Sequence, residues 1–234
     1  IKEVKGYLHA DNATSLNLPN LENVGGGLYT ENAQALELPN LENVGRDLYA
    51  KNAQSLNLPN LENVGGDLWA ENATSLNLPN LENVERNLHA ENAQSLNLPN
   101  LENVGGDFYA NKATSLNLPN LKNVEVCLHA ENAQVLELPN LENIGGSLWA
   151  SNARSLNMPN LENVGGDLDA ENAQSLDLAK IKNIGQNIYI FQDNPKKEEL
   201  IRKAKEWREK GILKGKIEIG KCDEERSWCK VQEL

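Results

Sequence analysis

Apolar and polar positions recur along this chain with a fixed period of twenty residues. Nine units run without insertion from residue 8 to residue 187 with the consensus L-x-A-x-N-A-x-S-L-x-L-P-N-L-x-N-V-G-G-x, and residues 1–7 match the last seven positions of the same unit. Positions 1, 3, 6, 9, 11, 14 and 17 are apolar, which combines the alternation of strands with wider steps at corners. The pattern predicts short strands separated by turns, with no helix inside a unit.

Position 12 is proline in eight units, and Gly-Gly fills positions 18 and 19 in five. Proline prevents a helix and removes a sheet donor, so each unit turns there, and the paired glycines predict a second tight turn. One unit cannot bury both faces of its strands, whereas stacked units cover each other at about 4.8 Å per coil. We expect an all-β repeat solenoid, either a parallel β-helix or leucine-rich-repeat-like, roughly 45 Å long.

Asparagine occupies position 5 in eight units and position 16 in all nine. Stacked coil on coil, these amides can hydrogen-bond to the neighbouring backbone and to one another, which satisfies polar groups that the turns would otherwise bury unpaired. We therefore predict a structural role for both columns rather than contact with a ligand.

The motif L-x-N-V-G-G-D-L-x-A-x-N-A-x-S-L, as in residues 61–76, resembles the leucine-rich repeat family and its receptor L-domain relatives. The resemblance covers about four fifths of the chain. It implies a solenoid with a parallel sheet on one face and partner binding there, without catalysis. The chain departs from the family pattern because alanine replaces the second strand leucine and Asn72 follows Ala70 by only two residues. A horseshoe unit and a more triangular β-helix both remain open.

The period ends at Ile188 and divides the chain into a solenoid of residues 1–187, comprising the partial coil 1–7 and nine coils over 8–187, and a small α-helical C-terminal cap of residues 188–234. The net charge is −14 in the first part and +2 in the second. Asn194 as N-cap, Pro195 in the first turn and Gly211 past the end predict a helix over about 195–210.

The predicted helix carries an apolar stripe that suits the open end of the solenoid, formed by Leu200, Ile201, Ala204 and Trp207. Residues 216–219 can add a strand. Cys222 and Cys229 bracket a loop short enough for a disulfide in an oxidising environment, although the sequence equally allows both thiols to stay reduced.

The strand at positions 1 to 3 turns positions 20, 2 and 4 outward, because side chains alternate along a strand. Position 2 collects aromatic and imidazole rings, namely His9, Tyr29, Tyr49, Trp69, His89, Tyr109, His129 and Trp149. Acids flank these rings, at position 4 as Glu31, Glu71, Glu91 and Glu131 and at position 20 as Asp47, Asp67 and Asp107. One interpretation is that the rings only stabilise coil on coil; the other is that rings between carboxylates bind cationic groups or sugar faces.

The whole chain has a net charge of −12 and a pI near 4.8, which opposes binding to nucleic-acid phosphates and anionic membranes. No apolar run reaches the ~18 residues of a membrane span. We therefore expect a non-catalytic binding scaffold that recognises a protein or peptide with basic groups, or a carbohydrate, along the ring and acid face. No direct nucleic-acid binding, no membrane insertion and no cofactor are expected, and the oligomeric state is not indicated.

A second acidic row occupies position 15, where Lys122 and Lys182 are the exceptions among Glu22, Glu42, Glu62, Glu82, Glu102, Glu142 and Glu162. The row is typical of a solvated face. The alternative hypothesis is that it imitates the phosphates of duplex DNA and inhibits a DNA-binding protein.

Catalysis has little support in the sequence. No nucleophile-elbow, phosphate-loop, HExxH or EF-hand motif occurs, and nearly every carboxylate is repeated in the next coil. The three histidines lie two and four coils apart, too far for joint metal ligation, so no metal site and no enzyme are predicted. A catalytic group needs an environment that occurs once in the chain. Only residues that break the repeat have one, and these are Lys112, Lys122, Glu125, Cys127, Arg154 and Asp169.

Overall fold

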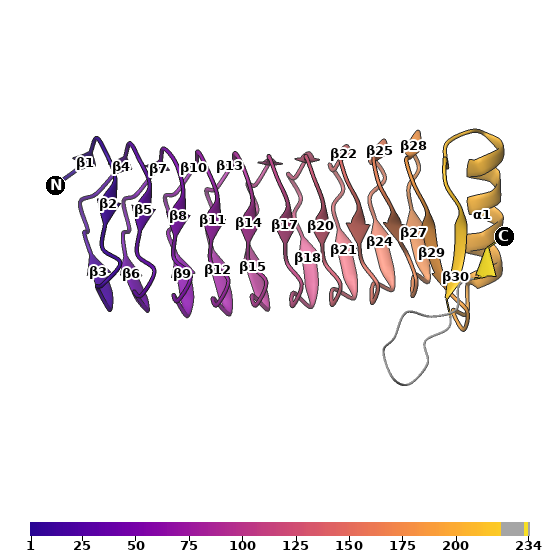
Figure 1. Cartoon of the computed structure of the whole chain (residues 1–234), viewed down its shortest axis with the longest axis horizontal. Coiled ribbons are helices and arrows are strands. Elements are labelled where there is room, and N and C mark those ends of the chain that lie inside the picture. The colour runs from indigo at the N-terminus through magenta and orange to yellow at the C-terminus, as the bar shows by residue number, and fades with distance from the viewer. Residues whose placement is uncertain (221–231, 234) are drawn as a thin grey trace.

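The computed structural model describes residues 1–220 and 232–233 as a rod of stacked coils with a helix at the C-terminal end (Figure 1). Repeat strands pair in parallel with the strand twenty residues later, as Leu8 does with Leu28 and Asn23 with Asn43, except at two breaks on one side of the rod. Each repeat position therefore forms a column along the rod. The predicted all-β solenoid with a helical cap is confirmed. Within the described residues, no helix is long and apolar enough to cross a membrane.

The strands of each coil lie on three faces. Sheet 1 contains β1 (Glu3–Val4), β4 (Asn23–Val24), β7 (Asn43–Val44), β10 (Asn63–Val64), β13 (Asn83–Val84), β16 (Asn103–Val104), β19 (Asn123–Val124), β22 (Asn143–Ile144), β25 (Asn163–Val164) and β28 (Asn183–Ile184). Sheet 2 contains β2 (Leu8–His9), β5 (Leu28–Tyr29), β8 (Leu48–Tyr49), β11 (Leu68–Trp69), β14 (Leu88–His89), β17 (Phe108–Tyr109), β20 (Leu128–His129), β23 (Leu148–Trp149), β26 (Leu168–Asp169), β29 (Ile188–Phe191), β30 (Ile217–Gly220) and β31 (Gln232–Glu233). The third face is divided into β3 (Ser15–Asn17) with β6 (Ala35–Glu37), then β9 (Ser55–Asn57), β12 (Ser75–Asn77) and β15 (Ser95–Asn97), then β18 (Ser115–Asn117), β21 (Val135–Glu137), β24 (Ser155–Asn157) and β27 (Ser175–Asp177).

The corners between these faces follow from the consensus. At L-P-N-L the N–H of Leu41 donates to the carbonyl of Leu38 at 3.2 Å, across a turn with Pro39 at its second position, where proline is favoured. At A-x-N-A the N–H of Ala53 donates to the carbonyl of Ala50 at 3.1 Å. With a third corner at V-G-G, the cross-section is three-sided, as in a triangular β-helix.

The glycines of the third corner have a different role from the one their sequence suggests. Among the described glycines only Gly211 has a positive φ. At position 18 a Cβ on Gly45 would lie 2.3 Å from the carbonyl oxygen of Gly25 in the preceding coil. Close approach between coils, rather than turn conformation, therefore favours glycine there.

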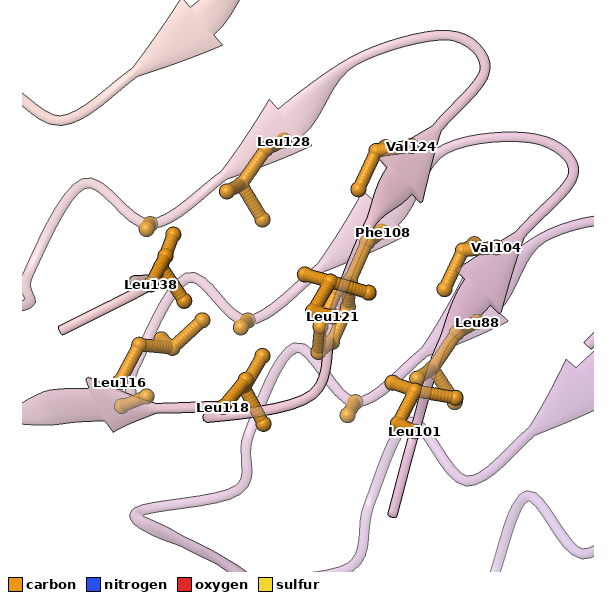
Figure 2. Packing of buried hydrophobic residues seen from close by; sticks show 14 of the residues in the cluster. Leu88, Leu101, Val104, Phe108, Leu116, Leu118, Leu121, Val124, Leu128 and Leu138 are labelled. Carbon is orange, nitrogen blue, oxygen red and sulfur yellow. The ribbon is translucent and has the colours of Figure 1, made fainter. Parts of the chain in front are cut away.

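The predicted inward positions form the core, which runs the length of the rod. Figure 2 shows how Leu88, Phe108 and Leu128 succeed one another in column 1, around a core shared with the valines of sheet 1 and the leucines of the third face. Phe108 is fully buried where the other coils have leucine. The small alanines at positions 3 and 6 are buried at the two ends of the A-x-N-A corner.

Both predicted asparagine columns are structural. At position 16 the amides form a ladder, in which Asn63 Nδ2 donates to Asn43 Oδ1 at 3.1 Å and Asn83 continues it at 3.0 Å. At position 5 the amide of Asn92 donates to the carbonyl of Glu71 at 2.6 Å. A third column at position 13 was not foreseen: Asn60 Nδ2, for example, donates to the carbonyl of Pro39 at 2.9 Å.

The cap continues the register of two faces while a helix replaces the third. β30 pairs in parallel with β29, with Ile217 opposite Ile188, and Leu213 bridges to Ile184 at the end of sheet 1. Residues 213–220 thus take the places of the next coil in sheets 1 and 2. The helix α1 (Lys197–Glu209) fills the longer connection and packs on β29. Of its predicted apolar stripe, Leu200, Ile201 and Ala204 are buried and Trp207 is half-buried against the core.

The helix begins two residues later than expected. Asn194 is not its N-cap; its amide instead donates to the carbonyls of Glu171 at 2.8 Å and Ala173 at 2.9 Å, which ties the cap to the last coil. The predicted end is confirmed, because Gly211 has a φ of 70° and its N–H donates to the carbonyl of Arg208. Cys222 and Cys229 lie outside the described residues.

Candidate functional site

The predicted binding residues line the outer side of sheet 2, which we call the outer face: columns 20, 2 and 4 along β2 to β29. In-register pairing places each ring of column 2 beside the next, as Tyr29 beside Tyr49 and His89 beside Tyr109. Most of the rings are half-buried, while His89 is only 9% exposed and His9 is exposed. The structure therefore brings the expected columns together on one continuous surface.

The rings form an almost parallel stack from His9 to His129. Tyr29 and Tyr49 have their centroids 4.9 Å apart, Trp69 and His89 3.8 Å apart, and Tyr109 and His129 4.6 Å apart with planes 15° from parallel. Each ring in the stack covers the face of the next, and only ring edges are directed outward. The rings therefore stack coil on coil, and this stacking limits access of a ligand to the ring faces.

Two acids of column 4, Glu71 and Glu91, contact neighbouring side chains. Lys51 Nζ lies 3.3 Å from Glu71 Oε1 and 4.3 Å from the centroid of the Trp69 ring. His89 Nδ1 lies 2.8 Å from Glu91 Oε1. The other ring nitrogen of His89 and Glu91 Oε2 are buried without a hydrogen-bond partner among the described residues.

The acids of column 20 are tied to the backbone of the following coil. Asp47 Oδ1 accepts the N–H of Asp67 at 2.9 Å, and Asp67 Oδ1 accepts the N–H of Asn87 at 2.9 Å. Each side chain is held by this bond, which the sequence did not predict. Columns 20, 2 and 4 of residues 8–187 together contain eleven carboxylates, one lysine and no arginine, so acidic side chains far outnumber basic ones on the outer face.

The C-terminal end of the outer face differs from the rest because Asp169 stands in column 2. Its side chain is 5% exposed, and Trp149 and Tyr189 on either side approach to 6.5 Å between centroids. Ser151 Oγ donates to Asp169 Oδ2 at 2.8 Å and the N–H of Glu171 donates to Oδ1 at 3.1 Å.

The carboxylates at this end have raised pKa values. Burial raises the pKa of Asp169, and the hydrogen bonds from Ser151 and from the backbone of Glu171 only partly oppose it. Burial, with a smaller contribution from the Asp169 charge, raises the pKa of Glu171 to about 7. The sequence signal for this pair was the break in the ring column at Asp169.

Two groups of side chains on the outer face could hold a metal ion. Asp107, Cys127 and His129 each offer one ligand atom, and these atoms lie within 4.8 Å of one another; the same holds for Glu71, His89 and Glu91. The expectation that the histidines cannot share a metal is unaffected, since each group contains one histidine. Both groups form because the register of the strands places residues of two neighbouring columns and two adjacent coils side by side.

A polar hollow of about 450 Å³ lies beside the cap, away from the ring column. Its lining consists mainly of amides, with Arg154 and Asp193 as its two charged groups, and comprises Asn132, Gln134, Asn152, Arg154, Asn172, Gln174, Phe191, Asp193, Asn194 and Pro195. Arg154, which breaks the repeat, thus lines this hollow beside the cap, just as Asp169 breaks the repeat near the same end of the rod.

No protein-family model matches the chain, and neither the curated proteins nor the solved structures contain a match.

Proposed function

We propose that the protein is a non-catalytic binding scaffold whose outer face recognises a protein or peptide with basic groups. The observation that carries the proposal is the charge of that face, because nine carboxylates stand in its three straight columns besides the pair Asp169 and Glu171, whose pKa values are raised, against one lysine. Such a field attracts cationic partners and accelerates their association. Column 20 supports this role further, because backbone hydrogen bonds hold Asp47 and Asp67 in place before a partner arrives, which reduces the entropy lost on binding.

A glycan is the less favoured partner. Sugar rings bind proteins by stacking on open aromatic faces, and from His9 to His129 those faces cover one another. Ring edges and carboxylates remain, and both suit the stems and heads of lysine and arginine side chains. Membership of the leucine-rich repeat and receptor L-domain family is part of the proposal, supported by the repeat consensus alone.

The rival function, inhibition of a DNA-binding protein by the acids of column 15, has weaker support. Three of these acids form ion pairs with lysines of the same column: Glu22 with Lys2 at 2.6 Å, Glu102 with Lys122 at 2.7 Å, and Glu162 with Lys182 at 2.7 Å. The pairs interrupt the negative row at three places, so column 15 presents a less continuous charge than the outer face.

The test measures binding of a fluorescent lysine- and arginine-rich peptide by anisotropy at low and high salt. An outer-face variant carries Glu31→Gln, Asp47→Asn, Asp67→Asn, Glu71→Gln and Glu131→Gln. Asparagine occurs naturally at position 20, as Asn87, and Asn87 Oδ1 still accepts the next N–H, so the variant should retain the fold. A control changes five acids of column 15, namely Glu22, Glu42, Glu62, Glu82 and Glu102, to Gln.

We expect the outer-face variant to bind the peptide at least about tenfold more weakly and with a shallower salt dependence, and the control to change affinity less than about twofold. The opposite result, loss of binding only in the column 15 variant, would replace the proposal with charge mimicry. Equal affinity in all three proteins would exclude both.

A further inference from the structure

Three different metal-binding side chains meet at one place on the outer face. Asp107 and Cys127 are successive members of column 20, and His129 follows Cys127 by two residues, so it points to the same side of the strand. Their ligand atoms lie within 4.8 Å of one another. In the part of the chain that the structure describes, this is the only such group that contains a thiol.

Hydrogen bonds hold two of the three side chains in position. Asp107 Oδ1 accepts the N–H of Cys127 at 2.9 Å, and Cys127 Sγ accepts the N–H of Ser147 at 3.3 Å. Both acceptors retain further lone pairs, and the second oxygen of Asp107 is not used by this bond. Cys127 is part-exposed and not in a disulfide, so an ion can reach it from solvent.

The third side chain, His129, has the orientation of a metal-binding histidine. Its ring lies against Tyr109 with centroids 4.6 Å apart, which fixes the ring plane. Nδ1 lies 3.4 Å from Glu131 Oε1, and Nε2 lies 3.9 Å from Asp107 Oδ1. When Nδ1 carries the proton and donates it to Glu131, Nε2 has a free lone pair on the side of Asp107. A carboxylate behind a metal-binding histidine orients the ring in the same way.

We propose that Asp107, Cys127 and His129 bind a divalent ion of the zinc class, with Glu131 as the residue that positions His129. In a tetrahedral zinc site neighbouring ligand atoms are about 3.5 Å apart, so the observed 3.9 Å between nitrogen and oxygen requires only a small adjustment. Sulfur and nitrogen donors favour zinc over calcium or magnesium, which prefer oxygen ligands. Three protein ligands leave a fourth position for water.

The neighbouring group of Glu71, His89 and Glu91 serves as the natural comparison. It has no sulfur, and Lys51 already lies 3.3 Å from Glu71. His89 is 9% exposed, with Trp69 stacked on it at 3.8 Å between centroids, which restricts entry of an ion. A zinc-class ion is therefore expected at Cys127 rather than here.

The experiment titrates the full chain with Co²⁺, whose bond to a thiolate gives a charge-transfer absorption, and then displaces it with Zn²⁺. Two variants remove ligands by restoring residues common in their columns, which keeps the fold: Cys127→Asp, as in Asp107 and Asp167, and His129→Tyr, as in Tyr29 and Tyr49. His89→Tyr is the matched control. Because Cys222 and Cys229 also carry thiols, the titration is repeated with both changed to Ser.

We expect one Co²⁺ per chain with thiolate absorption in the wild type, in His89→Tyr and in the Cys222→Ser, Cys229→Ser protein. Cys127→Asp should lose the absorption, and His129→Tyr should weaken binding at least about 100-fold. Glu131→Gln should keep the absorption and bind Zn²⁺ about 10- to 100-fold more weakly.

Three outcomes would overturn the site: thiolate absorption that persists in Cys127→Asp, absorption that is lost when Cys222 and Cys229 are changed to Ser, or no thiolate absorption in the wild type. Unchanged affinity in Glu131→Gln would overturn the positioning role of Glu131. None of these outcomes depends on a peptide partner, so the metal site and the proposed binding function are tested separately.

Discussion

The ring column of the outer face has two regions, and the second has a carboxylate, Asp169, where the first has rings only. From His9 to His129 every position is a ring, and the rings stack with centroids 3.8 to 5.6 Å apart. Asp169 takes the place of a ring in the ninth coil. The rings before and after it, Trp149 and Tyr189, have their centroids 6.5 Å apart. We call these the stacked region and the interrupted region.

The comparison shows that the repeat sets position and the side chain sets chemistry. In the stacked region the rings cover one another's faces, and the flanking acids are partly exposed to solvent. In the interrupted region the carboxylate is removed from water, and burial raises the pKa of both Asp169 and Glu171. A solenoid can therefore place a distinct chemical environment in one coil without disturbing its neighbours, since each coil contacts mainly the adjacent ones.

The largest expected effect comes from detaching the cap, because Tyr189 belongs to β29, on which α1 packs. Leu200→Asp places a charge at a site only 3% exposed and should lower the free energy of unfolding by about 3–5 kcal/mol. The exposed edge of sheet 2 should also promote association, which light scattering after size exclusion would detect. Lys205→Asp, on the exposed side of α1, is the control; equal loss in both variants would contradict a capping role for the buried stripe.

A smaller loss of stability is expected when a tryptophan is removed from either region, and its size should differ between the two regions. Trp69→Ala removes stacking on Tyr49 and His89 and the contact with Lys51, so we expect a loss of about 2–3 kcal/mol in urea unfolding. Trp149→Ala should cost only about 1 kcal/mol, because Trp149 makes a single, tilted ring contact. Removal of the Trp149 ring also lets water reach the Asp169 carboxylate, which offsets part of the cost. Similar losses in the two variants would mean that the stack adds little beyond burial of each ring.

The smallest effect concerns the pH dependence of the interrupted region. The pKa of Glu171 rises from its ordinary 4.5 to about 7 on folding, so the folded state binds more protons in that window and stability falls as pH rises from about 4.5 to 7. Asp169→Asn removes one buried charge and should stabilise the protein by about 1–2 kcal/mol at pH 8, with little change at pH 4. It should also lower the pKa of Glu171, though not to its ordinary value, because burial is the larger cause.

Carboxyl NMR titration and urea unfolding at the two pH values measure both effects of Asp169→Asn. Asp67→Asn, in a half-buried position of column 20 within the stacked region, is the control and should show no such pH contrast. A stabilisation that is the same at pH 4 and pH 8 would argue against a buried charge at Asp169.

The sequence by itself determined the columns. A strict period of twenty, proline at position 12 and apolar residues at fixed places allow one arrangement in which every coil covers the next, because any shift of register would expose the apolar set. The asparagine ladder, the ring column and its flanking acids follow from that register, and the helix end at Gly211 follows from local chemistry.

Only the tertiary structure decided how side chains use that register. The closed ring faces, the backbone bonds of Asp47 and Asp67, and the burial of Asp169 depend on rotamers and on contacts between coils, which no single unit encodes. The proximity of Cys127 to His129 and Asp107 joins two columns and two coils, so analysis of one column at a time could not reveal it. Likewise the cap continues two faces and replaces the third, because the end of the stack supplies open sheet edges that residues 213–220 can pair with.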